Sequence, residues 1–84
     1  MTMNDFNATR PVHVLITDTK LTIVLTDGRE ISNPLEWFPW LQHATPEQQS
    51  HYELWHASVD WIDLDQGVDV EGMLRGIKPR KKLA

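Results

Sequence analysis

The clearest pattern along the chain is an alternation of apolar and polar side chains that begins after Pro11. Apolar residues occupy every second position in two neighbouring stretches, first Val12, Val14 and Ile16 and then Leu21, Ile23 and Leu25. A period of two places such residues on one face of a β-strand, and the many β-branched side chains favour strands over a helix. The polar residues 17–20 between the two stretches predict a turn.

A second turn is predicted at Asp27-Gly28, because glycine tolerates the positive φ that tight hairpins require. A two-residue loop would place an apolar residue opposite an acidic one. A three-residue loop with Gly28 as a bulge places Ile23 opposite Ile31 and keeps the apolar face together, so we prefer this register. The pattern therefore predicts a three-stranded antiparallel sheet over residues 12–33.

The next segment predicts a short turn of helix. Asn33 can cap a helix, and a proline such as Pro34 is tolerated at the first helical position. Residues 35–41 are therefore expected to form a short helical turn that Pro39 cuts.

A longer helix is predicted after Thr45. Thr45 and Gln48 have the spacing of a capping box, in which each side chain bonds the backbone of the other residue. We expect a helix over residues 46–54 that buries Tyr52 and Trp55.

The remaining pattern predicts one more strand and one more helix. Residues 57–62 are rich in apolar and β-branched side chains, as is typical of a strand, and Asp69 is placed to cap a helix over 70–74 that Gly76 ends. The expected fold class is α+β: a small antiparallel sheet of three N-terminal strands plus one C-terminal strand, with two or three short helices packed on one side. Residues 1–10 are expected to form a flexible arm, 11–76 the single domain, and 77–84 a basic flexible tail.

Charge is distributed unevenly along this pattern. The chain has twelve acidic and eight basic residues, and five of the eight basic residues lie in the last ten positions. Between Glu30 and Leu74 there are nine acidic residues and no lysine or arginine. Such a body repels the phosphates of nucleic acid and attracts basic surfaces, so we expect no direct nucleic-acid binding through it. The alternative is that the acidic residues only keep a small protein in solution.

Composition excludes several function classes. The chain has no cysteine, which removes disulfides, thiolate nucleophiles and cysteine-ligated metal sites. Of its histidines the closest pair, His51 and His56, lacks the spacing of a helical zinc site, and the run 63–69 does not match a calcium loop. We expect no metal, no cofactor and no enzymatic activity. Without an apolar span or a signal peptide, the chain is expected to be soluble, cytoplasmic and without a membrane partner.

Four tryptophans are a high number for 84 residues. Trp55 and Trp61 are expected in the core, because large rings fill the interior of a small domain. Trp37 and Trp40 flank Phe38-Pro39, and so short a segment cannot bury every ring. One of these two tryptophans is therefore expected at a contact surface.

Residues 12–76 resemble a bacterial family labelled domain of unknown function 2442. The resemblance rests on the Asp-Gly hairpin, a tryptophan before an acidic Leu-Asp run, and Val-Glu-Gly before a leucine, within the segments 21–30, 34–41, 44–48 and 59–76. It implies a small α+β fold and no established enzymatic activity, and some relatives are taken for antitoxins. By size and charge alone the chain is also similar to phage anti-CRISPR inhibitors.

These observations lead to one functional hypothesis and an alternative. The chain is expected to be a monomeric, non-enzymatic inhibitor, from a cell or a phage, that covers the basic surface of a nucleic-acid-handling protein in the manner of a DNA mimic. The candidate contact residues are Glu47, Glu53, Asp60, Asp63, Asp65, Asp69, Glu71, Trp37 and Trp40. The alternative is an antitoxin or regulatory partner of a toxin that acts through an apolar surface.

Overall fold

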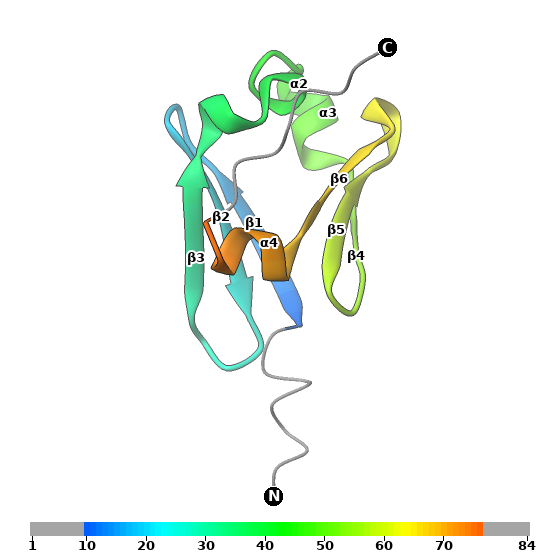
Figure 1. Ribbon diagram of the computed structural model, residues 1–84. Coiled ribbons are helices and arrows are strands. Elements are labelled where there is room, and N and C mark those ends of the chain that lie inside the picture. Colours follow the sequence, from blue (N-terminus) through cyan, green and yellow to red (C-terminus); the bar gives the residue numbers. More distant parts are fainter. Residues whose placement is uncertain (1–9, 77–84) are drawn as a thin grey trace, which may run out of the picture.

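Two antiparallel β-sheets of three strands each lie on opposite sides of the core in this computed structural model, which describes residues 10–76 (Figure 1). The first sheet has the strand order β1-β2-β3, formed by β1 Pro11–Ile16, β2 Lys20–Leu25 and β3 Glu30–Pro34. The second has the order β4-β5-β6, formed by β4 Tyr52–Leu54, β5 Ser58–Trp61 and β6 Gln66–Asp69. The α+β class is confirmed, whereas the prediction of one sheet with four strands is wrong.

The helical segments lie at one end of the two sheets and in the gap between them (Figure 1). In the described part of the chain they are η1 Leu35–Trp37, α2 Pro39–Gln42, α3 Pro46–Ser50, η2 Ile62–Leu64 and α4 Val70–Leu74. Figure 1 shows α2 and α3 together at one end of the two sheets, while α4 lies between β3 and β6. The helices therefore close the space between two sheets, and the expectation that they cover one side of a single sheet is wrong.

The first sheet forms as its sequence predicts. Gly28 has φ +91°, and the backbone N–H of Leu25 donates to the carbonyl of Arg29 at 2.8 Å across the three-residue loop. The carboxylate of Asp27 accepts a hydrogen bond from the backbone N–H of Arg29 at 3.0 Å and so orders the turn. Ile23 pairs with Ile31, which confirms the predicted register.

The segment after this sheet differs from its prediction. Asn33 does not cap a helix: it lies in β3 and is buried, and Pro34 is the last residue of the same strand. The predicted interruption at Pro39 is confirmed: η1 ends at Trp37, and Pro39 begins α2, where its missing N–H costs no hydrogen bond. Pro34 therefore ends a strand and is followed by a turn of 3₁₀ helix. Pro39 then begins a turn of α-helix.

The helix α3 begins as predicted and ends early. Thr45 Oγ1 accepts from the Gln48 backbone at 3.1 Å, and Gln48 Oε1 accepts from the Thr45 backbone at 3.0 Å, which confirms the capping box. The helix stops at Ser50 because His51, with φ −99° and ψ 79°, leaves the helical region. The following residues pair with β5 as β4, so strand pairing across the fold overrides the local helical pattern.

The second sheet was predicted only in its central strand. β5 lies within the expected 57–62, but its partners β4 and β6 are three and four residues long, too short to show a period. The chain turns between β5 and β6 through Asp65, which has the left-handed φ of 53°. The last helix is confirmed: Asp69 caps α4 by accepting from the Gly72 backbone at 3.0 Å, and Gly76, with φ +70°, follows its end.

The core is formed by both sheets and the helices between them. Its fully buried side chains include Trp61, whose indole N–H donates to the Gln49 carbonyl at 2.9 Å. Trp55 is 50% exposed, so its assignment to the core is wrong, and Tyr52 is only half-buried. The error follows from the helix prediction, because on a strand Trp55 falls on the opposite face from Trp61.

Two expectations lie outside the described residues: the flexible arm, except for Arg10, and the basic tail over 77–84. Within the described part, every helix is too short to cross a membrane.

Candidate protein-binding surface

The outer face of the second sheet carries a row of polar residues. Register pairs Glu53 with Asp60 and Asp60 with Gly67, so these three residues share one face of the sheet. The alternate residues Val59, Trp61 and Val68 point to the core and are buried. Alternation along β5 therefore places the carboxylates outside and the core side chains inside.

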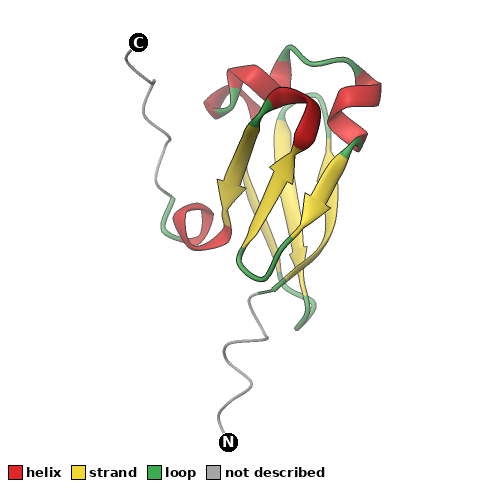
Figure 2. Cartoon of the chain, turned by 90° about the vertical axis from the view of Figure 1, so that its right-hand side faces the viewer, coloured by secondary structure: helices red, strands yellow, loops and turns green. Residues whose placement is uncertain are grey.

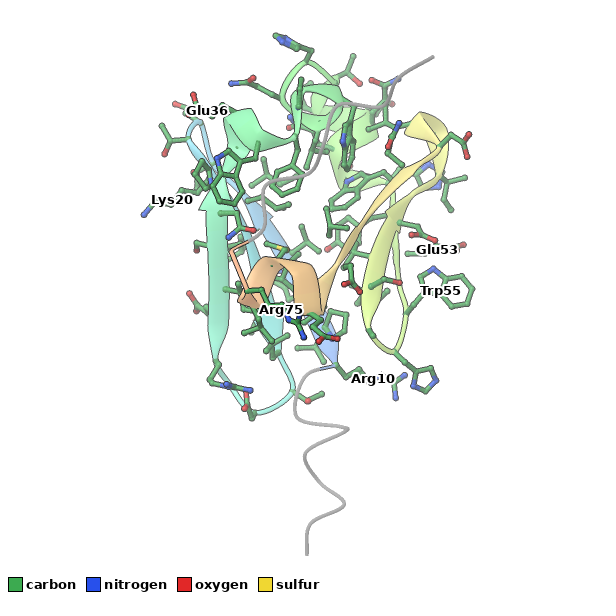
Figure 3. All side chains as sticks on the ribbon, viewed as in Figure 1. Arg10, Lys20, Glu36, Glu53, Trp55 and Arg75 are labelled. Atoms are coloured by element: carbon green, nitrogen blue, oxygen red, sulfur yellow. The ribbon has the colours of Figure 1, made fainter. Side chains whose placement is uncertain are left out.

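An exposed tryptophan continues this face. The backbone N–H of Trp55 donates to the Ser58 carbonyl at 2.8 Å and extends the pairing of β4 with β5. Trp55 follows Glu53 by two residues, and Figure 3 shows both side chains on the side of β4 and β5 that faces away from the core. An indole beside a carboxylate can contact both the stem and the head of a lysine or arginine.

The same face is hollowed into an open groove of about 470 Å³. Its lining comprises Glu53, Asp60, Trp61, Ile62, Asp65, Gln66 and Gly67. We use the name acidic face for the groove's carboxylates and the two exposed apolar side chains beside them: Glu53, Asp60, Asp65, Trp55 and Ile62.

A glycine is required in the floor of this groove. A Cβ at Gly67 would collide with Asp60 Oδ1 and approach the Val59 carbonyl oxygen to 2.9 Å. The Asp60 carboxylate therefore lies directly over the bare backbone of β6. A side chain at this position would displace that carboxylate.

The three carboxylates of the acidic face carry no ion pair within residues 10–76, where the salt bridges are Asp27–Arg29, His51–Asp63 and Glu71–Arg75. Glu53 and Asp60 also stand directly opposite each other on neighbouring strands. Like charges in such a pair are destabilising by up to about 1 kcal/mol, and unpaired charges attract cations from a distance. The fold therefore retains an arrangement that carries a cost in stability.

The remaining acidic candidates are used differently. Asp63 Oδ2 lies 2.9 Å from His51 Nδ1, and this hydrogen bond, followed by the charge of Asp63, raises the pKa of His51. Asp69 caps α4, and Glu71 pairs with Arg75 one turn later at 2.8 Å. Glu47 is exposed in the first turn of α3, outside the groove. Of the seven predicted acidic residues, the structure brings Glu53, Asp60 and Asp65 together.

The two predicted contact tryptophans, Trp37 and Trp40, are neither fully buried nor fully exposed. Trp37 and Trp40 are half-buried and pack against the core. The Trp40 ring meets Trp61 edge to face, with centroids 5.6 Å apart, and Phe38 at 6.1 Å. Trp55, which was predicted in the core, is exposed. Residues two apart on a strand share one face, so the spacing of Glu53 and Trp55 is the signal that could have placed Trp55 at the surface. A strand of three residues is too short for this alternation to be recognised in the sequence.

The acidic face combines negatively charged and apolar side chains. In the described part of the chain no three histidine or acidic side chains are grouped closely enough to hold a metal ion. The acidic face offers spread carboxylates, an indole and an aliphatic side chain, which suit the charged heads and apolar stems of basic side chains.

Comparison with known proteins gives one match. A family model described as "Protein of unknown function (DUF2442)" matches residues 11–79. No curated protein and no solved structure matches the chain.

Proposed function

The chain belongs to the DUF2442 family, whose function is unknown, and we propose that it is a non-enzymatic cytoplasmic protein that binds a protein partner through its acidic face. The partner is a nucleic-acid-handling protein, and the acidic face covers its basic surface and so inhibits it. The chain acts as a monomer in this role.

One observation supports this proposal above the others. Glu53, Asp60 and Asp65 are gathered on one face without ion pairs among the described residues, and Glu53 and Asp60 carry like charge at paired positions of neighbouring strands. Acidic residues that serve only solubility gain nothing from direct opposition. A surface that receives cations gains a focused negative potential from it.

Binding is expected to proceed in two stages. At a distance, the carboxylates attract the basic surface and raise the rate of encounter, an effect that salt weakens. In contact, the exposed rings and chains of Trp55 and Ile62 provide apolar area that the charges alone lack. Tryptophan is among the residue types that most often dominate the energy of an interface.

A charge-matched pair of variants tests the proposal. The first combines Glu53→Lys, Asp60→Lys and Asp65→Asn, with asparagine chosen because it tolerates the left-handed backbone of Asp65. The control combines Asp18→Lys, Glu36→Lys and Glu30→Gln, which changes the net charge equally at exposed positions outside the acidic face.

Each protein is immobilised and used to capture partners from a bacterial lysate at low and high salt, with duplex DNA or RNA as competitor. Wild type and control are expected to retain nucleic-acid-binding proteins that the competitor releases. The first variant should retain about tenfold less, since each exposed ion pair contributes up to about 1 kcal/mol. Equal capture by both variants would show that the acidic face is not the contact surface.

The apolar alternative has its own support on the first sheet. Val12 and Leu15 in β1 are 45% and 44% exposed. A toxin partner that binds there through apolar contact would be captured equally at low and high salt and lost on Leu15→Ser. Because the acidic face is distant in sequence and lies on the other sheet, the same capture experiment separates the two candidates.

A further inference from the structure

The second sheet has a free edge at β6. The strand order β4-β5-β6 leaves one side of β6 without a partner strand among the described residues. Figure 2 looks onto the outer face of this sheet and shows β6 as its outermost strand, leading directly into α4. An open strand edge presents a row of backbone donors and acceptors to an incoming segment.

The register fixes which backbone groups point outward. The Val70 N–H donates to the Ala57 carbonyl at 2.9 Å, so this pair is a hydrogen-bonded one. Hydrogen-bonded and non-hydrogen-bonded pairs alternate along an antiparallel ladder. Val59 and Val68 therefore form a hydrogen-bonded pair, and Asp60 and Gly67 form a non-hydrogen-bonded pair. The N–H and C=O groups of Gly67 and Asp69 therefore point away from β5, toward the open edge.

The acidic face begins at this edge. Gly67 has no side chain, and the Asp60 carboxylate lies over its backbone. Asp65 precedes β6 and lines the same groove. A long cationic side chain from a strand added beside β6 would pass over Gly67 without obstruction and reach the Asp60 carboxylate. A second cation two positions along the same strand would lie on the same face, near Asp65.

We propose that β6 accepts an extended segment of the partner protein as a fourth strand, with lysine or arginine at alternate positions of that segment. The inference rests on the proposed function, to which it adds the form of the recognised segment. Backbone bonds to Gly67 and Asp69 give affinity, and the alternate cations give selectivity through Asp60 and Asp65. A second copy of this chain is a poor occupant of the same edge, because it would bring the Asp60 and Asp65 carboxylates beside each β6 toward those of the other copy.

A defined peptide tests the proposal on the full chain. The probe is an acetylated and amidated heptapeptide of threonine and valine with arginine at its third and fifth positions. Amide hydrogen exchange measured by NMR reports strand addition, and the amide of Ser32 is a matched control. The Leu35 N–H donates to the Thr19 carbonyl, so the alternation along the β2–β3 ladder makes Thr22 and Ser32 a non-hydrogen-bonded pair. The backbone N–H of Ser32 therefore points away from β2, toward the outer edge of β3.

At saturation with the probe, exchange of the Gly67 and Asp69 amides is expected to slow by about tenfold or more, while Ser32 is unchanged. A probe with glutamine in place of both arginines should bind about tenfold more weakly, as should the wild-type probe to Asp60→Asn. A probe methylated on alternate backbone nitrogens, so that the edge-facing N–H groups are lost, should fail to protect either amide.

Three results would overturn the inference. Salt-sensitive binding without protection of Gly67 and Asp69 would mean that the acidic face binds side chains only, and would leave the proposed function standing. Absence of binding would reject an extended basic segment as the ligand, while the capture experiment judges the proposed function independently. Formation of a dimer with protected β6 amides would make a second copy the occupant.

Discussion

The two sheets share one core but differ on their outer faces. On the first sheet, Thr22 and Ser32 satisfy each other through a hydroxyl hydrogen bond of 2.6 Å. On the second, Glu53 and Asp60 are paired across neighbouring strands and carry like charge. Thr22 and Ser32 thus satisfy each other within the chain, whereas Glu53 and Asp60 form no ion pair within residues 10–76. The outer faces therefore differ in whether paired polar side chains bond each other.

The local construction of the two sheets differs in the same way. Strands of five and six residues and a glycine turn build the first sheet from neighbouring sequence. The second relies on shorter strands that the buried Trp61 holds through its contacts with Gln49, Trp40 and Tyr52. The second sheet thus has an anchored inner face and an exposed outer face.

The largest effect is expected at Trp61. Trp61→Ala removes a fully buried ring and leaves the Gln49 carbonyl without its donor, which should lower the free energy of unfolding by about 3–5 kcal/mol. Trp55→Ala, on the outer face, should change it by at most about 0.5 kcal/mol. Urea unfolding followed by circular dichroism measures both.

Trp61→Phe is the milder control, should Trp61→Ala fail to fold, and it should still lose more stability than Trp55→Ala. Similar losses at Trp55 and Trp61 would contradict the division of the second sheet into a structural inner face and a free outer face.

A smaller effect is expected at Asp69, an acidic residue that caps a helix and lies outside the acidic face. Asp69→Ala removes the cap of α4 and should cost about 1 kcal/mol, whereas Asp69→Asn retains an acceptor and should cost a few tenths. Asp69→Asn should also leave lysate capture unchanged. If the asparagine variant instead loses partner capture to the same extent as the acidic-face variant, Asp69 belongs to the contact surface and the contrast fails.

The smallest effect is a difference in how the two sheets respond to pH. Beside the second sheet, the hydrogen bond from Asp63 raises the pKa of the exposed His51. A raised pKa gives stability that is fully present below the unfolded value of about 6.5 and is lost as pH rises through the folded value. At the hairpin of the first sheet, the backbone N–H of Arg29 is the largest cause of the lowered pKa of Asp27. That contribution is lost as pH falls through the folded pKa of Asp27.

Unfolding of wild type and of His51→Gln at about pH 5.5 and about pH 8.5 measures the second-sheet contribution. Wild type should be slightly more stable than the variant at the lower pH and equal to it at the higher. Asp63→Asn should remove the same increment. An advantage of wild type that grows with pH would reverse the assigned sign and refute the pair.

How far the sequence predicts the molecule depends on how local each interaction is. The hairpin at Gly28, the capping box of Thr45 and the cap at Asp69 each involve residues at most a few positions apart, and all three were predicted correctly. The end of α3 was predicted wrongly, because the residues after Ser50 form β4. β4 forms by pairing with β5, which lies several residues further along the chain. Local propensity cannot weigh that pairing.

The candidate surface shows the same limit. The acidic residues were evident as a charge imbalance, but their grouping was not, since Asp63, Asp69 and Glu71 have partners or roles that only the folded chain supplies. Trp55 was placed in the core because a helix was expected to continue through it. The helical period was assigned to residues that form a strand, and this error placed the Trp55 side chain in the core when it is exposed.

The amino-acid sequence alone determined the turns, the caps, the first sheet and the excess of negative charge, because each follows from neighbouring residues or from composition. Tertiary structure alone decided that there are two sheets, that Trp61 is inside and Trp55 outside, and that Glu53, Asp60 and Asp65 meet in one groove. The physical reason is the length of β4 and β6, which gain their extended form only from pairing with β5 and from the core beneath them.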